Sequence, residues 1–415
     1  MSVSKELPFT KDAFEDIAET YGTPVFVYDE AGIRASAQRL IKAFSWAEEL
    51  SDGQRNHFAV KATPTPAILR VVHDEGMGFD CSSRPELSMV SGAGLADTGI
   101  FYSSNNTPDE DYVYANELGG LINIDKLGYL EQVHRALGGL PTRMAIRYNP
   151  GKVKQGNDII GDPYDSKFGA RPDQVIEGLR RMRQLGATDV GIHTMVVSNE
   201  RRPESFAETA RLLRELAERA EAEAGVSVGF LNVGGGIGIN YHPDEDPVDI
   251  EGISQAIESE LAPMGIPIYT EHGRAVTGSH GYLLTRSTHG IQESWHRYLQ
   301  VDTSINNMAR LATVSAAFHV LDVLGREGDP EDKMFVVGSM CANTDRMFKE
   351  KLLPITTQPG DLLVIHDAGA HSRAHSHNYN FRLRAGEVLV HPDGTHSLIR
   401  RPETEDDLFA TTKGL

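Results

Sequence analysis

Cysteine is almost absent from this sequence, which has only two, Cys81 and Cys341, in 415 residues. Two thiols exclude a framework of disulfide bonds and a metal site built from four cysteines. Unpaired thiols are typical of a reducing compartment, so we expect a cytoplasmic protein. One of the two remains a candidate for chemistry.

Long hydrophobic runs are also missing, and none approaches the roughly 18 apolar residues of a membrane span. Positive charge is in short supply, since 40 basic against 59 acidic side chains leave a net charge of −19. Such a surface repels nucleic acid and anionic lipid, so we expect neither as a partner. The N-terminal segment is acidic without an apolar centre, so we expect no signal or transit peptide there.

Short apolar runs alternate with amphipathic stretches of helical period through about two thirds of the chain. The runs are rich in Val, Ile, Phe or Ala without strict alternation, as in strands buried on both faces of a parallel sheet. Eight strands alternating with helices is the count of a (β/α)8 TIM barrel. The predicted strands are 57–62, 78–82, 98–103, 120–125, 143–148, 189–195, 229–233 and 266–271.

An open, doubly wound sheet is the alternative fold, but it usually has a Gly-rich loop after its first strand, which 57–62 lacks. From about residue 276 the helical spacing fades and short strand-like runs take over. They predict a second, mostly β domain of the sandwich or barrel type. We expect a cofactor-binding barrel at 29–275, and a β domain made of 1–28 plus 276–415.

Polar side chains follow several predicted strands at their C-terminal ends, where barrel enzymes place their chemistry. Lys61 ends the first strand, Asp80 the second and His193 the sixth. Because burial disfavours a charged ammonium, the pKa of Lys61 should fall, as an imine-forming lysine requires. A strand-end lysine that merely reaches solvent is the simpler interpretation.

The ends of the seventh and eighth predicted strands carry residues that could bind an anion and a cationic ring. Residues 234–238 include four glycines, which let backbone N–H groups approach a phosphate, although a tight turn is an equal alternative. Glu271 and Arg274 could be a local ion pair, or a carboxylate for a ring nitrogen and a guanidinium for a phosphate. An imine-forming lysine, a phosphate cradle and such a carboxylate together describe a pyridoxal-phosphate site.

These segments resemble, in order, the motifs of the fold-type III pyridoxal-phosphate decarboxylases, above all the diaminopimelate decarboxylase branch. The resemblance covers almost the whole chain and implies pyridoxal 5'-phosphate as the cofactor and amino-acid decarboxylation as the reaction. The matching segments are 58–62 (FAVKA), 78–87 (GFDCSSRPEL), 167–169 (KFG), 232–236 (NVGGG), 271–274 (EHGR), 338–341 (GSMC) with Asp345, and 378–380 (NYN).

The resemblance also implies roles for individual residues. Lys61 would hold the cofactor covalently, and His193 would stack on its ring. Glu271 would pair with the protonated ring nitrogen, which makes the ring a strong electron sink after CO2 leaves. The other cofactor-binding residues would be Asp80, Gly235, Gly236, Gly273, Arg274 and Tyr379.

Cys341 would reach the active site of a partner subunit and help to protonate the substrate carbon. This role implies a homodimer with shared active sites, which the β domain would complete together with the dimer interface. The alternative for Cys341 is a small buried apolar side chain, as is common for free cysteines. Cys81 is expected to be structural.

The substrate-binding positions depart from the family's pattern. Ala342 follows the cysteine, where the family usually carries a Glu or Asp that binds a distal ammonium. Arg310 is present, but Leu311 and Val314 replace the proline and tyrosine that usually follow it, and His371 stands where tyrosine is frequent. A buried ammonium without its partner loses about 1–3 kcal/mol or more. We therefore do not expect meso-diaminopimelate to be the substrate.

An amino acid or amino-acid conjugate with a distal carboxylate, such as a siderophore or secondary-metabolite intermediate, suits these departures better. A racemase or epimerase is the alternative, although such enzymes carry an arginine at the ring nitrogen. A non-catalytic homologue would be expected to lose the lysine or the cysteine. The histidines at 366–377 lack the spacing of a metal site. The predicted substrate-binding residues are Arg274, Arg310, Ala342, His371 and Tyr379.

Overall fold

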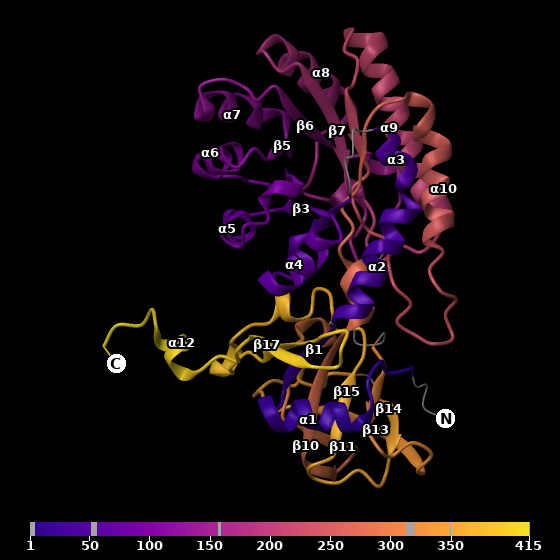
Figure 1. Ribbon diagram of the computed structural model, residues 1–415, viewed down its shortest axis with the longest axis vertical. Helices are drawn as coiled ribbons and strands as arrows, with labels where there is room; N and C mark the ends of the chain where they lie inside the picture. The colour runs from indigo at the N-terminus through magenta and orange to yellow at the C-terminus, as the bar shows by residue number, and fades with distance from the viewer. Residues whose placement is uncertain (1–4, 51–55, 157–158, 313–318, 349, 415) are drawn as a thin grey trace. The chain divides into compact units, whose positions relative to one another are not determined.

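The computed structural model describes residues 5–50, 56–156, 159–312, 319–348 and 350–414. The chain divides into two units, which we describe separately (Figure 1). The barrel unit comprises Arg34–Ile239 and Val248–Val276, and the β unit comprises Met1–Ile33, Asn240–Pro247 and Thr277–Leu415.

Eight parallel strands form the barrel unit's sheet, and neighbours in the sheet are consecutive in sequence. The sheet nearly closes on itself, since the N–H of His57 donates to the C=O of Thr270 at 2.8 Å. The predicted TIM barrel is confirmed. Its strands are β2 (His57–Ala59), β3 (Gly78–Cys81), β4 (Ile100–Tyr102), β5 (Leu121–Ile124), β6 (Arg143–Tyr148), β7 (Asp189–Thr194), β8 (Phe230–Asn232) and β9 (Ile268–Tyr269).

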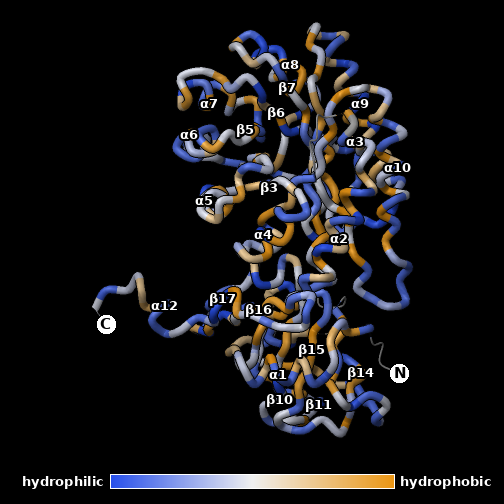
Figure 2. Tube along the Cα trace, viewed as in Figure 1, coloured by the Kyte–Doolittle hydropathy of each residue, from blue (hydrophilic) through white to orange (hydrophobic). Residues whose placement is uncertain are grey.

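Helices cover the outside of this sheet, and their hydrophobic and hydrophilic positions alternate along the chain (Figure 2). Three of them begin with a proline, whose missing N–H costs nothing in a first helical turn. Within the described ranges, no helix is long and apolar enough to cross a membrane. The helices are α2 (Glu30–Ala43), α3 (Ser45–Leu50), α4 (Pro66–Asp74), α5 (Arg84–Gly92), α6 (Asp109–Glu117), α7 (Leu130–Leu137), α8 (Pro172–Gln184), α9 (Pro203–Ala224), α10 (Ile250–Leu261) and α11 (Arg274–Thr277).

Aromatic side chains fill the interior of the barrel, where Phe101, Phe230 and Tyr269 pack with Ala145 in one buried cluster. The interior is therefore a packed core rather than a pore. Side chains two positions apart on a strand point to the same face. Arg147, two residues after Ala145, is thereby aimed into the barrel at the C-terminal ends of the strands, which we call the barrel mouth.

The β unit contains a sheet of nine strands built around β1 (Val25–Asp29). β1 pairs antiparallel with β10 (Gly281–Glu293) and parallel with β16 (Gly386–Val390), so segments from near both ends of the chain meet in one sheet. The predicted second, mostly β domain is confirmed. Its other elements are β11 (Arg297–Val301), β12 (Leu321–Val323), β13 (Glu331–Val337), β14 (Lys351–Pro354), β15 (Leu362–Ile365), β17 (His396–Arg400), α1 (Lys11–Tyr21) and α12 (Glu405–Phe409).

One short segment, Asn240–Pro247, belongs to the β unit although it follows a barrel strand. Lys5 Nζ donates to the C=O of Asn240 at 2.9 Å, and the ring of Tyr241 meets that of His319 edge-on at 4.9 Å. This excursion is not predictable from the sequence, because the segment has neither helical nor strand periodicity.

Candidate active site

Lys61 and Asp80 form an ion pair at the barrel mouth. Lys61 lies in the single 3-10 turn that follows β2, and Asp80 lies on β3. Lys61 Nζ is 2.5 Å from one carboxylate oxygen of Asp80, and the hydroxyl of Ser103 donates to the other. The Asp80 side chain is fully buried, whereas 43% of the Lys61 side chain is exposed. The amine is thus held in place and remains reachable.

The predicted fall in the pKa of Lys61 is wrong for this arrangement. Burial lowers the pKa of the Lys61 ammonium, but the carboxylates of Asp80 and Glu271 outweigh burial and raise it above its ordinary value. Burial and the neighbouring Glu271 also raise the pKa of Asp80, against the opposing effect of Lys61. The prediction considered only the apolar run around the lysine, whereas both carboxylates come from other strands.

Glu271 follows β9 and lies buried at the barrel mouth with both carboxylate oxygens occupied. Asn232 Nδ2 donates to Oε1 at 2.7 Å, and His193 Nε2 lies 3.2 Å from Oε2. Burial would raise the pKa of Glu271, but His193, followed by Lys61, outweighs burial and holds it well below its ordinary value. Glu271 is therefore a carboxylate at neutral pH, the form that attracts a cationic ring nitrogen.

His193, on β7, is fixed by a bond at each ring nitrogen. Its Nδ1 lies 3.0 Å from the side-chain nitrogen of Asn123, and its Nε2 faces Glu271. Both ring nitrogens of His193 are therefore engaged by side chains on or just after other strands. The two contacts fix the plane of the imidazole beside the Glu271 carboxylate.

Two residues of the mouth, Asn123 and Arg147, were not among those predicted from the sequence. The guanidinium of Arg147 lies over the ring of Phe168, 4.4 Å from its centroid, and donates to the C=O of Met195 at 3.2 Å. Burial lowers the pKa of Arg147, and Asp125 opposes the shift. A signal was present in the sequence, because Asn123 interrupts an apolar strand and Arg147 stands near the C-terminal end of another strand.

The glycines that follow β8 leave no room for side chains. A Cβ on Gly235 would lie 2.1 Å from the carbonyl oxygen of Glu271, and one on Gly236 would lie 2.5 Å from that of Val197. The N–H of Gly235 points at the sulfur of Met195 at 3.3 Å, a weak acceptor. A phosphate is a stronger acceptor than this sulfur and could take the N–H of Gly235. The backbone here, free of side chains, therefore suits a phosphate.

The third predicted glycine, Gly273, is needed for packing. A Cβ there would lie 2.8 Å from that of Ala62, next to the lysine-bearing turn. The following residue, Arg274, begins α11 and is only 5% exposed. The structure thus brings the predicted barrel residues into one unit, at the ends of β2, β3, β7, β8 and β9.

The two cysteines differ in environment. Burial raises the pKa of the Cys81 thiol well above its ordinary value, and Glu86 adds to the effect, so Cys81 is unsuited to act as a thiolate. Cys341 is exposed, so the alternative of a buried apolar side chain is wrong. Its N–H donates to Asn380 Oδ1 at 2.7 Å.

The loop that carries Cys341 is closed by several bonds, and we call residues 338–345 the cysteine loop. The Asp345 carboxylate accepts from the N–H groups of Ile305 and Met340 at 2.9 and 2.8 Å. Arg382 Nη2 donates to the C=O of Ser339 at 2.7 Å. The loop therefore presents its thiol on a fixed backbone.

The remaining predicted residues also lie in the β unit. Tyr379 is 58% exposed, and Arg310 lies in a 3-10 turn. His371 adopts a left-handed backbone conformation with φ of 59°, and its C=O is 2.6 Å from His375 Nδ1. Val314 lies outside the described residues.

The histidines near His371 do not form a common centre. His366 Nε2 is 2.7 Å from Asp322, whereas the rings of His371 and His375 stack at 5.9 Å. In the part of the chain that the structure describes, no group of three His, Cys, Asp or Glu side chains is arranged to hold a metal ion.

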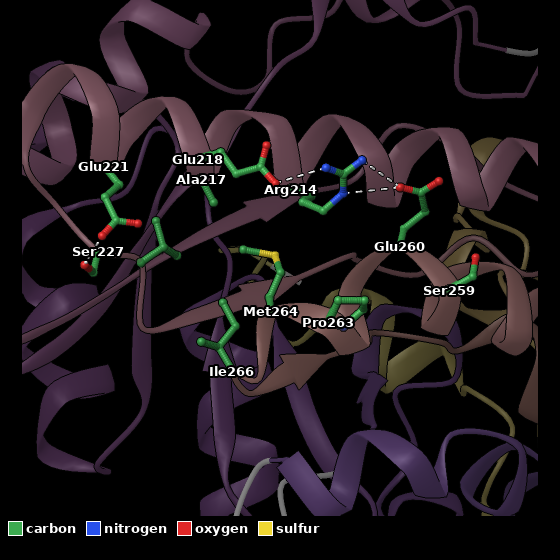
Figure 3. A pocket seen from close by; sticks show the side chains of 11 residues that line it. Arg214, Ala217, Glu218, Glu221, Ser227, Ser259, Glu260, Pro263, Met264 and Ile266 are labelled. Carbon is green, nitrogen blue, oxygen red and sulfur yellow. Dashed lines mark hydrogen bonds and ion pairs between the residues drawn. The ribbon is translucent and has the colours of Figure 1, made fainter.

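A separate pocket between α9 and α10 lies elsewhere on the barrel unit (Figure 3). Arg214 lies between Glu218 and Glu260 there, 3.0 Å from each carboxylate. The pocket is also lined by Val228 and Ile266, which precede β8 and β9. It therefore opens at the N-terminal ends of the strands, the side of a barrel associated with stability rather than chemistry.

Comparisons with known proteins agree with this geometry. The family model of the pyridoxal-dependent decarboxylase, pyridoxal binding domain, matches residues 37–278. The chain is 34% identical over 397 residues to protein TabA of Pseudomonas amygdali pv. tabaci, covering 95% of this chain and 92% of that protein. It is also 34% identical over 412 residues to diaminopimelate decarboxylase of Methanothermobacter thermautotrophicus, covering 96% and 93%. The crystal structure of diaminopimelate decarboxylase from M. jannaschii superposes with a TM-score of 0.87 at 26% identity, covering 96% and 94%.

Proposed function

The chain belongs to the pyridoxal-dependent decarboxylases, and from this membership we propose how its own residues carry out the reaction. It is a pyridoxal-5'-phosphate-dependent decarboxylase of the diaminopimelate decarboxylase type that acts on an amino-acid substrate. The reaction removes the α-carboxylate as CO2 and places a proton on the α-carbon. The roles of single residues, the shared active site and the substrate's side chain are our proposals.

The residues of the barrel mouth fit the cofactor. Lys61 would hold it covalently, with Asp80 orienting the amine, and the bare backbone at Gly235 and Gly236 would take its phosphate together with Arg274. The observation that supports this fit is that a Cβ at either glycine would clash with neighbouring backbone, so only glycine can stand there. When bound, the cofactor supplies an electron sink for the electron pair that remains on the α-carbon. Gly273 and Tyr379 would complete its binding site.

The Glu271 carboxylate is the observation that carries decarboxylation. It is buried and ionised, so it would keep the proton on the cofactor's ring nitrogen. Asn232 donates to one of its oxygens and the His193 ring contacts the other, and together they hold the carboxylate in position. His193 would also cover one face of the ring, as its fixed plane allows. A racemase of this fold would carry an arginine in place of Glu271, so racemisation is not favoured.

We propose that Cys341 supplies the proton for the α-carbon in the active site of a partner subunit, within a cytoplasmic homodimer. Cys341 is exposed, and its backbone N–H donates to Asn380. Large apolar side chains lie before and after Asn380 in the sequence. Tyr379, Phe381 and Leu383 are 58%, 64% and 40% exposed. Such apolar exposure is typical of a surface that another chain covers.

Subunit mixing tests the shared site. Lys61→Ala and Cys341→Ala homodimers should both be inactive, whereas random mixing should restore about a quarter of the wild-type activity. The restored activity would come from mixed dimers in which one site has both an intact lysine and an intact cysteine. Mixed samples without activity, despite demonstrated subunit exchange, would rule out shared sites.

We propose that the substrate ends in a carboxylate or another polar acceptor, and that it is not meso-diaminopimelate. Ala342 supplies no charge for a distal ammonium, whereas Arg310 and Arg274 are present to receive an acceptor. The overall similarity does not select a substrate, since the chain is 34% identical both to TabA and to a diaminopimelate decarboxylase.

A substrate panel tests this proposal. Purified holoenzyme is incubated with lysine, ornithine, meso-diaminopimelate and their ω-N-succinyl or ω-N-citryl conjugates, and CO2 is measured. We expect release from conjugates with a distal carboxylate and little from meso-diaminopimelate. The substrate proposal fails if meso-diaminopimelate is the preferred member, or if an enzyme with intact cofactor absorbance releases CO2 from none.

A further inference from the structure

A cavity of about 470 Å³ lies beside the cysteine loop within the β unit. Met340 and Ala342 line it on either side of Cys341 in the sequence. Tyr298 of β11 and Val337 of β13 also line it. The cavity is thus lined by both sequence neighbours of the cysteine that we propose as proton donor.

Only two of the residues lining this cavity are charged, Asp345 and Arg346. Asp345 is 4% exposed and its carboxylate is occupied by the N–H groups of Ile305 and Met340, so its charge serves the loop. Arg346 is exposed, and within the described residues it forms no ion pair. The charge that this cavity offers to a ligand is therefore positive.

Arg346 is held in a defined position. Its guanidinium carbon lies 4.9 Å from the centroid of the Phe335 ring, which itself stacks on Tyr298 at 5.9 Å. Its backbone pairs with Val337 across the base of the cysteine loop. A guanidinium stacked on an aromatic face keeps its N–H groups free along its edge, so little freedom is lost when it binds an acceptor.

We infer that this cavity is a binding subsite for a distal carboxylate of the substrate, and that Arg346 is the residue that recognises it. The inference rests on the proposed function, because the cavity is useful only if the cysteine loop reaches a decarboxylase site. Ala342 leaves open the space that a longer acidic side chain would take, and removes a charge that would repel the carboxylate. A planar guanidinium can then bind the carboxylate with two parallel hydrogen bonds.

Kinetics of three variants test the assignment, using the substrate from the panel that releases CO2 fastest. Arg346→Gln should raise KM for a distal-carboxylate substrate about 10- to 100-fold with kcat nearly unchanged, since a charge-assisted bond is lost. Arg346→Lys should recover part of the affinity. Ala342→Glu should also raise KM, and should lower it for substrates that end in an ammonium.

Lys333→Gln is the matched control, because it removes one positive charge from β13 at an exposed position that does not line the cavity. It should leave KM within about twofold. If Arg346→Gln and Lys333→Gln behave alike, the cation in the cavity does not recognise substrate and the inference is wrong, while decarboxylation itself stands.

Direct binding separates this inference from the proposed function. Tricarballylate, a tricarboxylate without an amino group, is titrated into the holoenzyme by calorimetry. We expect binding that Arg346→Gln weakens at least 10-fold and Lys333→Gln leaves unchanged. This result would support the subsite even if no panel member releases CO2. Equal binding by both variants, or no binding by wild type, overturns it.

Discussion

The barrel mouth and the cysteine loop illustrate two ways of building half of an active site. At the mouth, four side chains on or just after four strands already pair within one chain, Lys61 with Asp80 and His193 with Glu271. Around the cysteine loop, the hydrogen bonds hold the backbone, while the thiol stays exposed. The side chains of the mouth are fixed by one another, as a constant cofactor requires. The loop is fixed through its backbone, so its side chains can differ between enzymes with different substrates.

The largest difference between the two regions should be spectroscopic. Lys61→Ala should abolish both CO2 release and the visible absorbance of the lysine-bound cofactor, because Lys61 is the amine that Asp80 holds at the mouth. Cys341→Ala should abolish most turnover but keep that absorbance. Spectra of the two purified variants check this. A Lys61→Ala protein with unchanged absorbance would refute the cofactor assignment.

Glu271→Gln should lower kcat by roughly 100-fold or more, the size expected when one preorganised electrostatic group is removed. The amide fills the same space but carries no charge to keep the ring nitrogen protonated. Cofactor content should stay near wild type, which absorbance after dialysis measures. A variant with near-normal kcat would show that ring protonation does not depend on this carboxylate.

Gly235→Ala should weaken cofactor retention about 10-fold and destabilise the barrel unit by about 1–3 kcal/mol, because its Cβ would meet the Glu271 carbonyl at 2.1 Å. Gly92→Ala is the control, since a Cβ at this end of α5 has nothing within 4 Å. That change should be neutral or stabilise by up to about 1 kcal/mol. Equilibrium dialysis and urea unfolding give the two quantities for both variants.

Acid should weaken the barrel unit through two buried histidines. Burial lowers the pKa of His272 to about 3 and that of His57 to about 4. A histidine in the unfolded chain has a pKa of about 6.5. Below that pH the two histidines bind protons in the unfolded chain but not in the folded barrel. Stability should therefore fall with decreasing pH from about 6.5 to 4, by about 1.4 kcal/mol per pH unit for each histidine.

His272→Leu should remove one histidine's share of this slope, since neither ring nitrogen of His272 has a hydrogen-bond partner in the described residues. The exposed His289→Gln serves as control. Urea unfolding between pH 4.5 and 6.5 in a Trp295→Phe background follows the barrel unit, because Trp46 is then the only tryptophan. An unchanged slope in His272→Leu would contradict the burial argument.

Much of the barrel could be predicted because buried parallel strands are short apolar runs. The predicted 143–148 coincides with β6, and the predicted 266–271 contains the two-residue β9. α1 was not predicted, and only four residues of the thirteen-residue β10 were. The exposed half of β10 lacks an apolar run, because its position depends on pairing with β11 rather than on burial.

The candidate site was predictable where a residue stands at a strand end, as Lys61 and Glu271 do. It was not predictable where the effect depends on neighbours brought from other strands. The two carboxylates around Lys61 reversed the expected pKa shift. Arg147 is positioned by Phe168, and Asn123 positions His193, and in both pairs the partner lies elsewhere in the chain.

The place of β1 in the β unit has a consequence for how the protein is made. β1 pairs with β16, and Glu30 bonds to His391 across 361 residues of chain. On the ribosome, the barrel unit can be complete before β16 is synthesised, whereas β1 must wait through the whole of translation for this partner. Closing so long a loop is slow and exposes strand edges meanwhile. Folding of the β unit, and with it presentation of the cysteine loop, should therefore follow folding of the barrel unit.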